Sequence, residues 1–123
     1  MTNKPTILVV DDDAPIVTLM RSLLREFGFD PVTALSGAEA IETARAHPPA
    51  LVLLDKNMPG MSGADVARAL RADPAFERLP ILILSGEPMS KAELAEMQAD
   101  GAVMKPFDVT ALVEEIRKYV VAG

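Results

Sequence analysis

The sequence predicts an α/β protein built on one parallel sheet that helices cover on both faces. Short, nearly continuous apolar runs alternate along the chain with longer stretches in which apolar residues recur every three or four positions. Continuous apolar runs are typical of strands buried on both faces, whereas the second spacing is typical of amphipathic helices. Five such strand-then-helix units require right-handed crossovers between parallel strands. A doubly wound, five-stranded sheet is therefore the expected fold.

The first predicted helix has clear boundaries. Asp13 and Pro15 open it, since aspartate is favoured at the N-cap and proline in the first turn, and Gly28 ends it. Its apolar stripe consists of Ile16, Met20, Leu23, Leu24 and Phe27. The five strands are predicted at Thr6–Val10, Pro31–Leu35, Leu51–Leu54, Ile81–Leu84 and Ala102–Met104.

Capping patterns predict the other helices. Ser36–Glu39 and Ser90–Glu93 both have the pattern of a capping box, in which a serine and a glutamate three residues later bond each other's backbone N–H groups. The remaining boundaries are Pro48 at the end of the second helix, Ser62 and Asp73 around the third, and Asp108 as the cap of the last.

Length and composition restrict the class of protein. The chain has 123 residues, half of them hydrophobic, so we expect one domain over residues 1–123 without an output domain. The absence of cysteine excludes disulfides, zinc-thiolate sites and a thiol nucleophile. No apolar run approaches the ~18 residues of a membrane span, and the N-terminus lacks a signal-peptide pattern, so the expected location is the cytoplasm. The net charge of −6 argues against direct binding of nucleic acid.

Reactive polar residues follow four of the five predicted strands. Asp11 and Asp12 come directly after the first strand, Asp55 after the third, Ser85 after the fourth and Lys105 after the last. In a parallel α/β sheet the carboxyl ends of the strands lie along one edge, and ligands bind there. We therefore expect three or four carboxylates, one hydroxyl and one ammonium group to converge at a single site.

This set of groups suits a hard cation beside a phosphoryl group. Two adjacent carboxylates such as Asp11 and Asp12 repel each other unless a cation lies between them, and Mg²⁺ prefers few carboxylates together with water and phosphate oxygens. Asp55 can bind the cation and can also act as a nucleophile that forms an acyl phosphate. Lys105 can pair with a phosphoryl oxygen as a point charge, and Ser85 can donate a hydrogen bond to another.

The motifs around these residues resemble one family. The segments ILVVDD, LVLLDKNMPGMSG, ILILSG and KPF occur in this order and extend over essentially the whole chain. In this combination they closely resemble the receiver domain of two-component response regulators, in particular a stand-alone receiver of the chemotaxis-regulator kind. The resemblance implies a doubly wound (βα)5 flavodoxin-like fold with strand order 2-1-3-4-5, and a cis Lys105-Pro106 bond.

The resemblance also implies roles and partners. The implied site consists of Asp55 as phosphoacceptor, Asp11 and Asp12 as the acidic pair that organises Mg²⁺, the backbone carbonyl of Asn57 as a further metal ligand, Ser85 as the switch hydroxyl and Lys105 as the family's lysine. The implied partners are a histidine kinase or a histidine phosphotransfer protein and a downstream protein of unknown identity, with no direct contact to nucleic acid or membrane. Such a protein catalyses its own phosphorylation and dephosphorylation and is not a turnover enzyme.

One position departs from the family. Receivers usually carry Tyr or Phe three residues before the lysine, where this chain has Ala102. Switching through inward rotation of an aromatic side chain is therefore not expected at this position. The phosphorylation chemistry keeps all of its residues.

A second class of protein matches part of the pattern. Haloacid-dehalogenase-type phosphatases also begin with a strand and Asp-x-Asp, which Asp11 and Asp13 match, and continue with a strand-end hydroxyl and a lysine. Against this alternative, Pro15 stands where Thr or Val is usual, no acidic pair follows Lys105, and the Asp55-x-x-Met-Pro motif stays unexplained. Turnover of a phosphate ester would distinguish the two classes.

Two further alternatives fit less well. A flavodoxin-like FMN-binding protein needs a loop rich in hydroxyl groups and glycine after the first strand, where this chain has three carboxylates that would repel phosphate. A degenerate receiver that acts only as a docking module would not need the full set of site residues, which is present.

Overall fold

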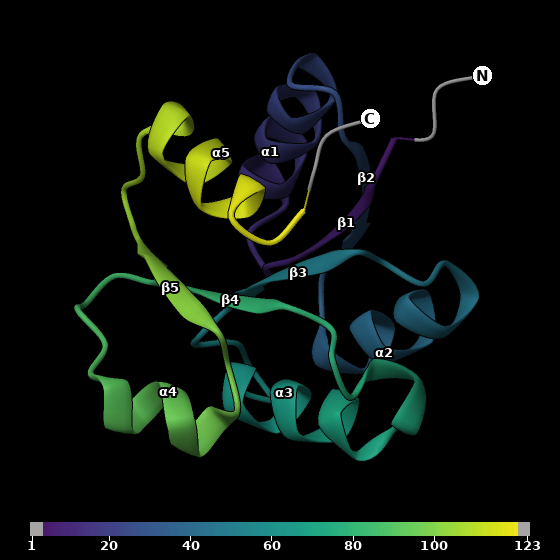
Figure 1. Ribbon diagram of the computed structural model, residues 1–123, viewed down its shortest axis with the longest axis vertical. Helices are drawn as coiled ribbons and strands as arrows, with labels where there is room; N and C mark the ends of the chain where they lie inside the picture. Colours follow the sequence, from purple (N-terminus) through teal and green to yellow (C-terminus); the bar gives the residue numbers. More distant parts are fainter. Residues whose placement is uncertain (1–3, 121–123) are drawn as a thin grey trace.

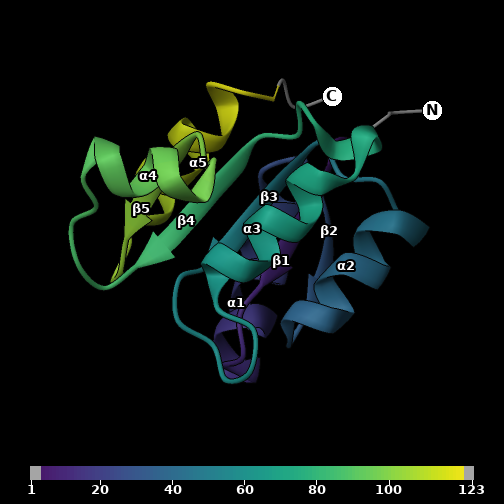
Figure 2. The same ribbon diagram turned by 90° about the horizontal axis from the view of Figure 1, so that it is seen from below.

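The computed structural model describes residues 4–120 and shows a five-stranded parallel sheet between two layers of helices (Figures 1 and 2). The strands are β1 (Thr6–Val10), β2 (Asp30–Ala34), β3 (Leu51–Asp55), β4 (Ile81–Ser85) and β5 (Gly101–Met104). Their order in the sheet is β2-β1-β3-β4-β5, so the predicted doubly wound topology is confirmed.

The helices form two layers. The layer on one face consists of α1 (Ala14–Glu26) and α5 (Val109–Arg117), and the layer on the other consists of α2 (Gly37–Ala46), α3 (Gly63–Ala72) and α4 (Lys91–Met97), as Figure 1 shows. A short 3-10 helix, η1 (Pro74–Phe76), follows α3. None of the helices in residues 4–120 combines the length and the apolarity that a bilayer span requires.

Strand side chains alternate between two hydrophobic cores, one on each face. In β1, Ile7 and Val9 pack in the core beneath α1 and α5, whereas Leu8 and Val10 pack in the core beneath α2 and α3. β3 and β4 are buried along their whole length, which explains their uninterrupted apolar sequences. In the described part of the chain, the buried polar side chains are Asp11, Asp55 and Ser85, and all three lie at the carboxyl edge of the sheet.

The strand boundaries differ slightly from the prediction. β2 begins and ends one residue earlier than expected, because Asp30 pairs with Thr6 and Ala34 with Val10, whereas Leu35 lies outside the ladder. β5 begins one residue earlier than expected, at Gly101. β3 and β4 each extend one residue further, so Asp55 and Ser85 are the last residues of their strands rather than the first of their loops. The ladder itself therefore fixes the backbone of both residues.

The predicted helix caps are largely confirmed. Asp13, Ser36 and Asp108 each accept a hydrogen bond from a backbone N–H in the first turn of their helices. The capping box at Ser90–Glu93 is complete. The box expected at Ser36–Glu39 is only half formed, since among the described hydrogen bonds only the serine hydroxyl contributes. A complete box that the sequence reasoning missed stands at Ser62–Asp65, where an aspartate takes the place of the usual glutamate.

Two helices end in the same hydrogen-bonded turn. At the end of α1, the N–H of Phe29 bonds the carbonyl of Leu24, and Gly28 adopts a φ of +90°. At the end of α4, the N–H of Ala99 bonds the carbonyl of Leu94, and the positive φ of 57° falls on Gln98. Both are Schellman turns, whose left-handed residue is usually glycine.

Candidate functional site

The carboxyl edge of the sheet brings three carboxylates together. One oxygen of each of Asp11, Asp12 and Asp55 lies within 4.8 Å of the others. Asp11 and Asp55 are buried, whereas Asp12 is exposed. The cluster forms because β1 and β3 are neighbours in the sheet, which places the end of one strand beside the end of the other.

Lys105 lies between the two buried carboxylates. Its Nζ is 2.8 Å from Asp11 Oδ2 and 3.3 Å from Asp55 Oδ1. The predicted cis bond between Lys105 and Pro106 is confirmed. One ammonium group against three ionised carboxylates leaves two negative charges uncompensated, which is the charge that a divalent cation would neutralise.

The charges of the site perturb one another. Burial raises the pKa of Asp55, the charge of Asp11 raises it further, and Lys105 together with the N–H of Asn57 opposes the rise without cancelling it. For Lys105, burial disfavours the ammonium form, but the hydrogen bond and charge of Asp11 and the contact with Asp55 outweigh burial and raise its pKa. Without a bound metal ion, the site therefore favours a cation and disfavours the ionised form of Asp55 beside Asp11.

Two backbone features support Asp55. The N–H of Asn57 donates to Asp55 Oδ1 at 3.4 Å, which keeps the loop after β3 folded against the carboxylate. Gly63, the first residue of α3, packs directly on the same strand end, because a Cβ there would lie 2.5 Å from the Asp55 carbonyl oxygen. The sequence predicts only that a helix begins near Ser62. The motif Ser62-Gly63 gave no sign that a side chain at this position would collide with β3.

Ser85 is at the site, but its hydroxyl bonds its own loop. Ser85 Oγ donates to the carbonyl of Glu87 at 2.7 Å and accepts from the N–H of Glu87 at 3.1 Å. The carbonyl of Ser85 accepts from the N–H of Lys105 at 2.7 Å, so the two residues are neighbours across β4 and β5. The structure thus brings together Asp11, Asp12, Asp55, Lys105 and the backbone of Ser85, with the hydroxyl of Ser85 bonded to Glu87.

The fold and the site together define a class of protein, a doubly wound sheet of order 2-1-3-4-5 with an acidic site and a lysine at its carboxyl edge. Residues 7–117 match the family described as the response regulator receiver domain. This chain therefore belongs to the response regulator receiver domain family. This assignment does not support the phosphatase alternative, and the Asp13 that it required caps α1.

Curated relatives are longer than this chain. The chain is 39% identical over 118 residues to the DNA-binding response regulator MtrA of Mycobacterium tuberculosis, a match that covers 94% of the chain and 50% of MtrA. It is 40% identical over 113 residues to MtrA of Mycobacterium leprae, covering 90% of the chain and 49% of that protein. The chain thus spans about half the length of the curated relatives it matches.

Solved structures of similar fold cover the whole domain. The chemotaxis protein CheY4 of Vibrio cholerae superposes with a TM-score of 0.92 at 28% identity, covering 96% of this chain and 100% of that one. The response regulator TrrA of Thermotoga maritima, in complex with Mg(2+)-BeF, superposes with a TM-score of 0.84 at 34% identity, covering 94% and 99%.

Proposed function

We propose that this chain is a phosphoryl-accepting receiver in which Asp55 takes the phosphoryl group of a phosphohistidine. The donor is a histidine kinase or a histidine phosphotransfer protein of a two-component or phosphorelay system. Membership of the receiver family supports the reaction class. Between the two buried carboxylates, the distribution of hydrogen bonds supports the choice of Asp55 over Asp11.

Asp55 has a carboxylate oxygen that the protein leaves free. Asp11 uses Oδ1 to accept from the N–H of Asp13 at 3.0 Å and Oδ2 to accept from Lys105. Asp55 directs Oδ1 toward both Asn57 and Lys105. Within residues 4–120, no donor bonds Asp55 Oδ2, and no buried side-chain oxygen lacks a partner, so Oδ2 is open to solvent. This free oxygen, on a carboxylate whose other oxygen lies 3.3 Å from the Lys105 ammonium group, is the observation that carries the proposal.

The reaction follows from this geometry. Oδ2 of Asp55 attacks the phosphorus atom, an O–P bond forms, the N–P bond of the phosphohistidine breaks, and the departing imidazole nitrogen takes up a proton. Lys105 supplies a positive charge for the phosphoryl oxygens. Ser85 supplies a hydrogen bond once its hydroxyl turns away from the carbonyl of Glu87.

The donor set fits Mg²⁺. It offers only hard oxygen ligands and retains negative charge after pairing with Lys105. We propose that Asp11, Asp12, Asp55 and the backbone carbonyl of Asn57 hold Mg²⁺, which when bound would neutralise charge on the phosphoryl oxygens. The complex of the similar TrrA with Mg(2+)-BeF supports this cofactor.

A groove beside the site is suited to the donor protein. Ile16 and Leu19 of α1, together with Lys105, Pro106 and Phe107, line a hollow of about 320 Å³. The side chain of Leu19 is 55% exposed there, although it is a large apolar residue. Because Lys105 belongs to both the groove and the site, a helix that docks its apolar face in the groove can present a phosphohistidine to Asp55.

The proposal is tested by intact-mass measurement after incubation with acetyl phosphate and Mg²⁺. We expect a single phosphate adduct in the wild type, no adduct in Asp55→Asn, and a retained adduct in the control Asp13→Asn, which alters only a helix cap. A stoichiometric adduct on Asp55→Asn would place the acceptor elsewhere. Rapid, sustained hydrolysis of p-nitrophenyl phosphate would instead favour a turnover phosphatase. The downstream protein, the lack of direct nucleic-acid and membrane contact and the cytoplasmic location stay predictions.

A further inference from the structure

α4 is anchored unevenly to the rest of the molecule. Its C-terminal half contributes the partly buried Leu94 and the buried Met97 to the core, whereas Lys91 and Ala92 in its first turn are exposed. The loop that precedes it, residues 86–89, is largely exposed, and a Cβ at Gly86 would contact nothing. Met89 packs against the core just before the helix, whereas the first turn of α4 itself has little packing.

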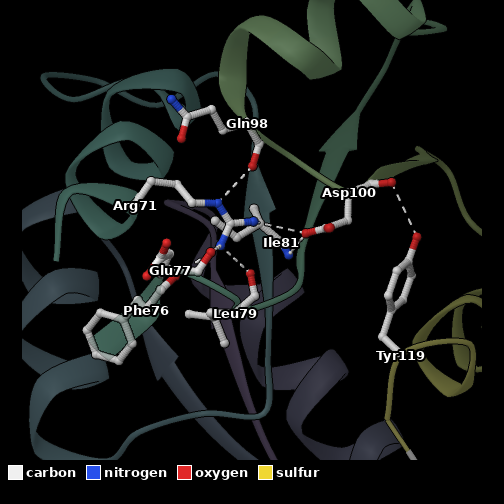
Figure 3. A network of polar contacts seen from close by, with 8 residues as sticks. All are labelled: Arg71, Phe76, Glu77, Leu79, Ile81, Gln98, Asp100 and Tyr119. Atoms are coloured by element: carbon white, nitrogen blue, oxygen red, sulfur yellow. Dashed lines mark hydrogen bonds and ion pairs between the residues drawn. The ribbon is translucent and has the colours of Figure 1, made fainter. Parts of the chain in front are cut away.

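The C-terminal end of α4 is fixed by Arg71 of α3, whose side chain is only 12% exposed (Figure 3). Its Nε donates to the carbonyl of Gln98 at 3.0 Å, and its Nη2 donates to Asp100 Oδ2 at 3.0 Å. Asp100 Oδ2 also accepts from the N–H of Ile81 at 2.8 Å. This end of α4 is thus bonded both to α3 and to the first residue of β4.

A single ion pair ties the other end of α4 to the phosphoacceptor strand. Lys56, the residue after Asp55, has its Nζ 3.4 Å from Oε2 of Glu93 in the first turn of α4. In residues 4–120 no other side-chain bond joins that turn to the rest of the protein. The pair is partly exposed, with 27% and 46% of the two side chains accessible, so it is a weak contact.

We propose that the Lys56–Glu93 ion pair holds the N-terminal end of α4 in its resting position and opens when Asp55 is phosphorylated, so that α4 pivots about its end at Arg71. The inference rests on the proposed phosphorylation of Asp55. Phosphorylation adds about 1.5 to 2 negative charges to the residue that directly precedes Lys56. It also draws the hydroxyl of Ser85 away from Glu87, which displaces the loop that leads into α4.

Thermodynamic linkage makes the proposal measurable. A contact that exists in only one of two states opposes a ligand that selects the other state, so removing the contact tightens binding of that ligand. An exposed ion pair corresponds to a factor of about two to five in an equilibrium constant. The phosphoryl analogue beryllofluoride, added with Mg²⁺, is the ligand to use.

Two single variants and their combination test the pair by calorimetric titration. Glu93→Gln removes the charge but keeps an oxygen that can accept from the N–H of Ser90 in the capping box, and Lys56→Met keeps the apolar stem. Each is expected to tighten beryllofluoride binding by about two- to fivefold, with no further gain in the double variant. Amide exchange of the ligand-free variants should accelerate in residues 91–93 and stay unchanged at Met97.

The matched control is the exposed ion pair between Glu115 and Lys118 at the end of α5. Glu115→Gln removes this pair and should leave the affinity for beryllofluoride unchanged. Equal affinity in wild type, Glu93→Gln and Lys56→Met, or weaker binding in Lys56→Met, would overturn the inference alone, since the wild type would still bind. Failure of the wild type itself to bind beryllofluoride would overturn both this inference and the proposed function.

Discussion

Asp55 carries a charge that the resting fold disfavours. Burial and the charge of Asp11 raise its pKa above the ordinary value, so its ionised form destabilises the folded protein at pH values above that raised pKa. This cost shrinks as the pH falls below the raised pKa and is lost only below the unfolded value of about 4, where the carboxylate is protonated in both states. The same cost leaves the site ready to gain from a cation.

Asp55→Asn should raise the thermal midpoint near neutral pH, and the gain should shrink as the pH approaches about 4. Saturating Mg²⁺ should also reduce the gain, because the cation neutralises the wild-type site. Thermal unfolding followed by circular dichroism at several pH values measures the difference between variant and wild type. A gain that grows toward low pH would contradict the raised pKa.

Asp12→Ala should weaken Mg²⁺ binding by about tenfold or more, because one of three clustered carboxylates is lost. Its thermal stability without metal should stay equal or rise, because repulsion falls. Asp13→Ala is the matched control, since it removes a helix cap worth about 1 kcal/mol but no member of the cluster. Unchanged Mg²⁺ affinity in Asp12→Ala would place the cation elsewhere.

At the scale of elements, α1 and α4 end in the same type of turn, with glycine at the left-handed position after α1 and glutamine at the left-handed position after α4. Gln98 adopts the left-handed conformation that Gly28 adopts at the equivalent place, and a left-handed non-glycine residue costs roughly 1–2 kcal/mol. Gln98→Gly should therefore raise the free energy of unfolding by about 1 kcal/mol, since the bond to Arg71 uses the backbone carbonyl and is kept. Gly28→Ala should lower it by a similar amount. Urea denaturation measures both, and a loss of stability in Gln98→Gly would contradict the argument.

At the scale of the whole molecule, local patterns predicted the architecture because strands and helices with continuous burial or clear caps are specified by neighbouring residues. The convergence of Asp11, Asp12, Asp55 and Lys105 was predictable for the same reason, since parallel topology alone aligns the strand ends. The hydroxyl of Ser85 was not, because a backbone group only two residues away competes for its hydrogen bond. The hydrogen-bond partners of Arg71 lie up to 29 residues away in the sequence, and no sequence pattern predicts them.

Long-range switching is the remaining property of the whole molecule. Position 102 holds an alanine that is partly buried with the core of the α4 side, so no aromatic side chain there can exchange an exposed for a buried position. α5 is held by the buried Leu112, Val113 and Ile116. Reversing a two-state equilibrium from 1:99 to 99:1 requires about 5.5 kcal/mol of differential interaction. Under the proposed function, contacts around the site would have to supply it.

Phosphorylation should therefore alter the loop after Ser85 and α4 strongly and the face formed by β5 and α5 only slightly. Amide exchange with and without beryllofluoride tests this distribution. Changes concentrated around Asp55, Ser85 and residues 90–97 are expected, because in the proposed mechanism those segments would contact the phosphoryl group or move with the loop after Ser85. Large, cooperative changes over residues 109–120 would mean that another side chain, such as Tyr119 with its bond to the carbonyl of Asp100, transmits the signal in place of the missing aromatic.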